Sequence, residues 1–272
     1  MVNSPYRFNF VSEGKTNTMK YCILRKRELF LTVGIFCTVL VFSLFGAQKV
    51  AVEVASDLRS LPIYCVETKN QEKKIALGIN CAWGNEDIPS ILDTLDEAGI
   101  KATFFMVGTW CDKYPDSVKL IAERGHEIGN HSDTHADMPS LSEAQMEEEI
   151  ENCSQKIEKI TGKKPDLFRC PSGSYNNLVV ETAVRLGYYP IQWSVDSLDW
   201  KDLKPAEMEE RILPNLTYGD ILLFHNDTDY TARALPELIA KIQDKGYTFV
   251  TVGELIHRGD YTVDVTGRQF EK

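Results

Sequence analysis

Short apolar runs of strand length alternate with amphipathic stretches of helix length from residue 74 onward, and this alternation constrains the fold more than any other feature. Repeated through six units, it predicts an α/β domain of parallel strands joined by right-handed crossovers, either an open doubly wound sheet or a (β/α) barrel. The expected strands are 74–80, 102–107, the neighbours of Phe168, 189–195, 220–224 and 247–252. The expected helices are 88–98, 115–124, 143–160, 177–186, 206–213 and 232–245.

The ends of the expected helices carry recognisable residues. Ser142 to Gln145 has the spacing of a capping box, so the longest helix is expected to begin there. No Gly-x-Gly-x-x-Gly follows the first expected strand, so we expect no nucleotide cofactor and favour a barrel, where chemistry lies at the carboxyl ends of strands. Several stretches end at a glycine, which adopts the left-handed conformation at least cost: Gly99, Gly125, Gly162, Gly187 and Gly246.

Residues 29–47 are apolar and uncharged, and such a run is long enough to cross a bilayer as a helix. Basic residues outnumber acidic ones before it, so the positive-inside rule places 1–28 in the cytoplasm and the chain after residue 47 outside the cell. We interpret 29–47 as a transmembrane signal anchor followed by a linker at 48–72. A cleaved signal peptide and secretion is the alternative. A translation start at Met1 or at Met19 stays open.

Charge and cysteine content exclude some classes of function. The net charge of −10 argues against a nucleic-acid partner, which would need clustered Lys and Arg. Five cysteines follow the apolar run, an odd number without a CxxC pair, so a disulfide framework is not expected. Cys111 and Cys153 are interpreted as small buried apolar residues.

His131 and His135 form a His-x-x-x-His pair, a spacing that places two imidazoles on one side of a helical turn and suits a divalent metal such as zinc. Two unrelated polar residues are the simpler alternative for the pair alone. Further polar residues stand at the ends of expected strands, in chain order: 80–84 (NCAWG), 131–135 (HSDTH), 168–173 (FRCPSG), 196–200 (DSLDW) and 223–225 (LFH).

In this order and spacing the chain resembles the polysaccharide deacetylase family, also called the NodB homology family or carbohydrate esterase family 4, whose motifs read TFDDG, H[ST]xxH, RxPxG, DxxDW and LxH. It is similar to deacetylase-like proteins associated with sporulation. The resemblance covers residues 73–256, leaves a C-terminal tail at 257–272, and implies a distorted (β/α)7 barrel preceded by the N-terminal transmembrane helix. For the tail, two interpretations stay open: a disordered end, or a strand docked on the barrel.

The resemblance also implies an activity, the hydrolysis of N-acetyl groups on a wall glycan such as peptidoglycan by metal-activated water. The implied partners are an N-acetylated glycan polymer and the membrane, with no nucleic acid. The implied roles are metal ligands for His131 and His135, general acid for His225, acid-tuning partner for Asp199, orienter of the base for Arg169, groove wall for Trp200, acetyl-pocket lining for Leu223 and a backbone N–H near the oxyanion for Ser172. Each residue taken singly has a simpler interpretation: a turn cap for Asp199, core packing for Trp200, a surface ion pair for Arg169 and a rim histidine for His225.

The first motif departs from the family pattern. Asn80 stands where the family has its base Asp, and an amide cannot accept a proton. Cys81 stands where the family has its third metal ligand, and we hypothesise a zinc site of Cys81, His131 and His135, the alternative being a small buried Cys81. Cys170 has no role that we can derive. A pseudo-deacetylase that binds glycan or acts as a scaffold is therefore the alternative function.

Overall fold

The computed structural model describes residues 6–9, 21–24 and 59–272. The chain divides into two units, Met1–Arg59 and Ser60–Lys272. In the first unit, β1 (Tyr6–Asn9) pairs antiparallel with β2 (Tyr21–Leu24), which the sequence analysis did not predict. The predicted anchor at 29–47 lies outside the described residues. Within the described residues, no helix is both long and apolar enough to span a bilayer.

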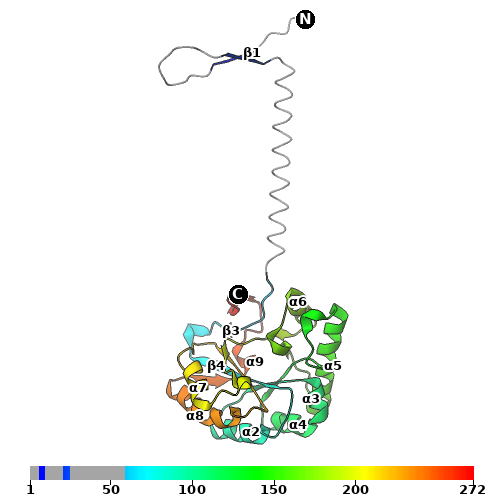
Figure 1. Ribbon diagram of the computed structural model, residues 1–272, viewed down its shortest axis with the longest axis vertical. Helices are drawn as coiled ribbons and strands as arrows, with labels where there is room; N and C mark the ends of the chain where they lie inside the picture. The colour runs from blue at the N-terminus through cyan, green and yellow to red at the C-terminus, as the bar shows by residue number, and fades with distance from the viewer. Residues whose placement is uncertain (1–5, 10–20, 25–58) are drawn as a thin grey trace. The chain divides into compact units, whose positions relative to one another are not determined.

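The second unit is built on a curled parallel sheet with the strand order β8-β7-β6-β5-β4-β10-β9, and β11 pairs with the start of β4 (Figure 1). The edge strands β8 and β9 belong to one chain segment, which pairs with β7 at its start and with β10 at its end, so this segment connects the two edges of the curled sheet. The strands are β4 (Lys74–Cys81), β5 (Thr103–Met106), β6 (Glu127–Asn130), β7 (Leu167–Phe168), β8 (Tyr189–Pro190), β9 (Val195–Asp196), β10 (Ile221–His225) and β11 (Thr248–Val250).

Most of the helices lie around the outside of this sheet (Figure 1). The six predicted helices are confirmed to within one or two residues, and α3 was not predicted because six residues carry little periodicity. The helices are α2 (Ile88–Glu97), α3 (Gly108–Lys113), α4 (Pro115–Glu123), α5 (Glu143–Thr161), α6 (Asn177–Arg185), α7 (Pro205–Ile212), α8 (Thr231–Asp244) and α9 (Val252–Leu255). Short 3-10 turns are η1 (Lys69–Gln71), η2 (Met138–Ser140), η3 (Pro171–Gly173) and η4 (Asp199–Lys201).

The predicted helix ends are also confirmed. The backbone N–H of Ser142 donates to Oε1 of Gln145 at 2.9 Å, which closes the capping box at the start of α5. Gly162, after the last turn of α5, has φ +75°, a conformation that a side chain would strain. The other four helix-ending glycines also have positive φ.

Alternation along β4 decides which of its side chains reach the functional end of the barrel. Ile75, Leu77, Ile79 and Cys81 join the large apolar cluster between the sheet and the outer helices. Ala76 packs in a second cluster on the other face of the strand, and Asn80 shares that face because side chains alternate with a period of two. Neighbouring residues 80 and 81 therefore point to opposite sides of the sheet.

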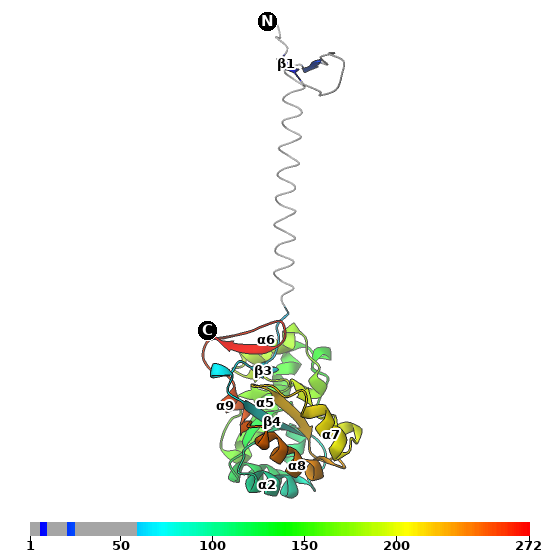
Figure 2. The ribbon, with the colours of Figure 1, turned by 90° about the vertical axis from the view of Figure 1, so that its left-hand side faces the viewer.

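The compact unit is wider than the predicted domain at 73–256. Part of the predicted linker forms β3 (Cys65–Val66), and the predicted tail forms β12 (Tyr261–Val263) and β13 (Arg268–Glu271). β13 pairs antiparallel with β12 and parallel with β3, and Figure 2 shows this C-terminal segment in red beside β3. Of the two open alternatives for the tail, the docked strand is correct.

His126 makes the stability of this unit sensitive to acid. Its Nδ1 accepts from the N–H of Ala102 at 3.2 Å, and burial lowers its pKa to about 4. The unfolded chain binds a proton near pH 6.5, so stability is lost as the pH falls from about 6.5 to about 4, with a slope of up to about 1.4 kcal/mol per pH unit. We expect the melting temperature of His126→Asn, which preserves an acceptor, to fall less than that of the wild type between pH 7.5 and pH 5. Equal falls in both proteins would contradict this assignment.

Candidate active site

A cavity of about 490 Å³ opens at the carboxyl ends of the central strands. Seven of the ten predicted site residues line it: Asn80, His131, His135, Ser172, Trp200, Leu223 and His225. Arg169 and Asp199 are fully buried behind the lining, and Cys81 is in the apolar core. The cavity also includes Trp83, Trp193, Asp196, Asp202, Asn226 and Asp227, which the sequence analysis did not assign to the site.

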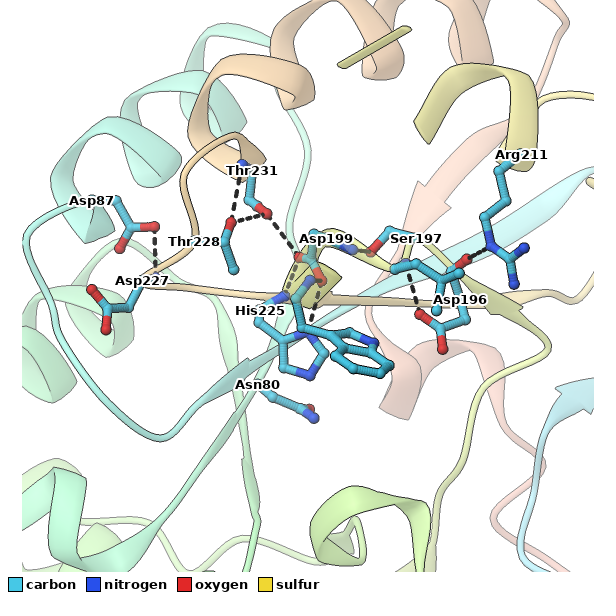
Figure 3. A network of polar contacts seen from close by, with 12 residues as sticks. Asn80, Asp87, Asp196, Ser197, Asp199, Arg211, His225, Asp227, Thr228 and Thr231 are labelled. Atoms are coloured by element: carbon cyan, nitrogen blue, oxygen red, sulfur yellow. Dashed lines mark hydrogen bonds and ion pairs between the residues drawn. The ribbon is translucent and has the colours of Figure 1, made fainter. Parts of the chain in front are cut away.

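His225 is held by Asp199 at the end of β10 (Figure 3). Its Nδ1 lies 2.8 Å from Oδ1 of Asp199, and its backbone N–H donates to Oδ2 at 2.6 Å. The carboxylate also accepts from the Thr231 hydroxyl at 2.7 Å and from the Trp200 N–H at 2.9 Å. Asp199 is thus no simple turn cap, because it fixes the ring so that Nε2 is the nitrogen left for a ligand, as a proton donor to a leaving amine requires.

The histidine pair also presents its rings to the cavity, but from a loop and not from the predicted helical turn, because Ser132 and His135 have positive φ. Nδ1 of His131 lies 2.7 Å from the backbone carbonyl oxygen of Arg169, so Nδ1 carries the proton and Nε2 is the free acceptor. The two rings lie with centroids 5.1 Å apart. Burial, and then the neighbouring His135, hold the pKa of His131 well below its usual value, and burial also lowers the pKa of His135. Both are therefore neutral imidazoles at neutral pH, the form that ligates metals.

Cys81 does not join the histidines, which corrects the hypothesis of a three-residue zinc site. Its side chain is fully buried on the opposite face of β4 from Asn80, and burial holds the pKa of its thiol well above the usual value, whereas zinc binds thiolate. Within residues 59–272, no group of three or more His, Cys, Asp or Glu is placed to hold a metal ion. The residues present therefore do not fit the family's three-ligand metal centre, and only two of its ligand positions are filled.

Arg169 lies under the cavity floor and is not a surface ion pair. Its Nη1 donates to Oδ1 of Asn80 at 3.0 Å and its Nη2 to the backbone carbonyl of Gln192 at 3.2 Å, while its Nε has no partner. The guanidinium carbon lies 3.9 Å from the ring centroid of Phe105. A Cβ at Gly78 would stand 2.6 Å from Nη2, so a glycine there makes room for the guanidinium.

No carboxylate neutralises Arg169 within the described residues. Burial lowers the pKa of its guanidinium to about 9, and the side chain at the base position that accepts from it is the uncharged amide of Asn80. Cation–π contact with Phe105 offsets part of the desolvation. Compared with the family pattern, Asn80 thus supplies neither the carboxylate expected as a base nor a counter-charge for the buried arginine.

Two tryptophans form exposed walls of the cavity. Trp200 is 55% exposed and Trp83 is 61% exposed, so neither is core packing. The ring centroid of Trp83 lies 5.2 Å from that of His135, on the side of the histidine pair, whereas the backbone of Trp200 is hydrogen-bonded to Asp199, the partner of His225. Wide, exposed indole faces beside a cavity are suited to stacking on sugar rings.

Comparison with known proteins now identifies the class. The polysaccharide deacetylase family model matches residues 67–191, and the chain belongs to that family. Among its relatives, the uncharacterized protein YlxY of Bacillus subtilis is 37% identical over 212 residues, covering 78% of this chain and 65% of YlxY. A peptidoglycan-N-acetylglucosamine deacetylase of Bacillus cereus is 35% identical over 195 residues, covering 70% of this chain and 91% of that protein.

Solved structures give the same class, and some of them are described as pseudoenzymes. BA3943 of Bacillus anthracis, described as a carbohydrate esterase family 4 pseudoenzyme, matches with a TM-score of 0.69 and 36% identity, covering 74% of this chain and 70% of that one. A BA3943 mutant described as having restored enzymatic activity matches with the same TM-score and identity, covering 74% of this chain and 72% of that one. The family thus contains both deacetylases and proteins without activity on this fold.

Giving Arg169 a counter-charge should stabilise the fold. Asn80→Asp places a carboxylate where Nη1 of Arg169 already donates, so we expect the free energy of unfolding to rise by about 1 kcal/mol or more, measured by thermal and denaturant unfolding at neutral pH. Asn152→Asp, the same change at an exposed position of α5, should leave stability nearly unchanged. A melting temperature of Asn80→Asp at or below that of the wild type would contradict the unpaired state of Arg169.

The burial of Cys81 predicts that it does not contribute to zinc binding. Titration of zinc into wild type and Cys81→Ala should give equal affinities, because the thiol lies on the far side of β4 from the histidines. His131→Ala should bind zinc more weakly, since it removes one of the two imidazoles. A tenfold loss of affinity in Cys81→Ala would restore the three-residue hypothesis.

Proposed function

We propose that the cavity binds an N-acetyl sugar of a bacterial wall glycan such as peptidoglycan, and that the chain is a hydrolase of the deacetylase family whose turnover is strongly reduced. The observation that carries this proposal is the hydrogen bond from Arg169 to Asn80, which puts an amide where the family has its base. Binding and proton donation have their residues in place, whereas activation of water does not.

Support for binding comes from the walls and the volume of the cavity. Trp83 and Trp200 offer two exposed indole faces, and Leu223 and Ser172 also line the cavity. A volume of about 490 Å³ is in the range of small-ligand sites and suits one sugar ring with its acetamido group. Relatives whose names state a peptidoglycan substrate support a wall glycan over other polymers.

Support for weak hydrolysis comes from the missing base. In an amide hydrolysis, His225 would give a proton from Nε2 to the departing amine while Asp199 stabilises the charged ring. Asn80 cannot take the proton of the attacking water, and its Oδ1 is already occupied by Arg169. Loss of a general base typically lowers the rate by about 10²–10⁴-fold.

A second candidate is a glycan-binding or scaffold protein without turnover. It is favoured by the burial of Cys81 away from His131 and His135, and by the similarity to the pseudoenzyme BA3943. Both candidates use the same cavity and the same ligand. They differ only in whether acetate is released.

We further propose that residues 29–47 hold the domain on the outer side of the membrane, close to the wall. The uncharged length of the run and the excess of basic residues before it support this topology. Secretion after signal cleavage would deliver the domain to the same compartment.

Acetate release separates the two candidates. With tetra-N-acetylchitotetraose and with peptidoglycan, supplied with zinc, we expect slow release by the full chain, a rate about 10²-fold higher for Asn80→Asp, and none for Asn80→Asp combined with His225→Ala. Asn152→Asp should match the wild type. If neither wild type nor Asn80→Asp releases acetate although the oligomer binds, the second candidate is correct. Absence of glycan binding would contradict both.

A further inference from the structure

The amide of Asn80 has a defined orientation. An arginine side chain has donors only, so the atom of Asn80 that faces Nη1 of Arg169 at 3.0 Å must be the oxygen. The Nδ2 group therefore points away from Arg169, and Asn80 is among the residues that line the cavity. Figure 3 shows Asn80 next to the ring of His225, its parallel neighbour across β4 and β10.

The position that accepts a proton in a deacetylase is thus a hydrogen-bond donor here. A donor in a cavity favours a carbonyl oxygen and disfavours a group that has only donors, such as an ammonium. The buried guanidinium of Arg169 directly behind it adds a positive charge that pairs with no carboxylate among the described residues, since the buried carboxylate of Asp199 binds His225 and Thr231 instead. Charge repulsion in a poorly solvated place is weakly screened, so it opposes an ammonium on the floor.

We infer that this cavity reads the acetylation state of the glycan: it binds sugars with an intact N-acetyl group, through the acetyl carbonyl and the Asn80 amide, and rejects the free amine that deacetylation leaves. This rests on the proposed binding of a wall glycan and names the chemical group that is recognised. The chain would therefore bind the substrate of a deacetylase more tightly than its product.

Carboxylates at the rim of the cavity oppose this selectivity, because they attract a protonated amine. Asp196, Asp202 and Asp227 line the cavity, and the last two are exposed. Together with the net charge of −10, they attract cationic oligomers without regard to the acetyl group. Salt screens these exposed charges but not the buried charge of Arg169. High salt therefore removes the attraction of the rim for amines and leaves the selectivity of the floor.

The test is calorimetric titration of the full chain with tetra-N-acetylchitotetraose and with chitotetraose, at about pH 6, where amines are protonated, and in about 0.5 M salt with EDTA. We expect the wild type to prefer the acetylated oligomer by about tenfold or more. Asn80→Asp replaces the donor by an anionic acceptor and should reduce this preference to about threefold or less.

Two controls make the result specific. Trp200→Ala should weaken the binding of both oligomers, because the indole stacks on the ring and not on the acetyl group, and Asn152→Asp should change neither affinity. Equal wild-type affinity for the two oligomers, or an unchanged preference in Asn80→Asp, would overturn the inference and leave glycan binding intact. Failure of both oligomers to bind would overturn the proposed function as well.

Discussion

The buried guanidinium of Arg169 is the interaction on which the site depends. Its side chain joins the end of β4, through Asn80, to the segment between β8 and β9, through the carbonyl of Gln192. Its own carbonyl fixes the tautomer of His131. Gly78 leaves space for it and Phe105 stacks under it. A change at any of these contacts would move both the floor of the cavity and the histidine pair.

That buried cation also explains why one substitution matters so much. With an acid at position 80, the arginine would orient a base and be neutralised by it. With Asn80, the hydrogen bond is preserved but the charge balance and the base are both lost, and Cys81 leaves the metal position without an anionic ligand. The acid side, His225 with Asp199, is unaffected because it lies on another strand and is held by Thr231 and by backbone groups. On the proposed function, the result is a cavity that binds the glycan and keeps the proton donor but lacks the base.

Much of the fold followed from the sequence because periodicity and helix ends are local signals. The capping box at Ser142 and the glycine at Gly162 bound the longest helix, and both had the expected geometry. β8 and β9 were expected as one strand, because the apolar character of the segment does not reveal that it changes partners between Tyr189 and Asp196. The β1–β2 pair depends on contacts between distant residues and leaves no period to detect.

Within the site, motif order located the residues but not the directions of their side chains. Cys81 was expected beside His131, and the two-residue period of β4 turned it into the core instead. That period was already available in 75–81, where odd positions are the large apolar ones. Trp83 carried a signal as well, since a tryptophan between Ala82 and Gly84 in a loop has little core to join. Asp227 also stood close to a signal, since it follows His225 by two residues at the end of β10. Trp193 had none, because it lies between β8 and β9, outside the strand-end motifs.

The most direct test of this account is a crystal structure of the wild-type chain with tetra-N-acetylchitotetraose. The account predicts an uncleaved N-acetyl sugar in the cavity, with its carbonyl oxygen within hydrogen-bond distance of Nδ2 of Asn80 and its ring beside Trp200. A glycan bound elsewhere, or an acetyl carbonyl that faces away from Asn80, would contradict it.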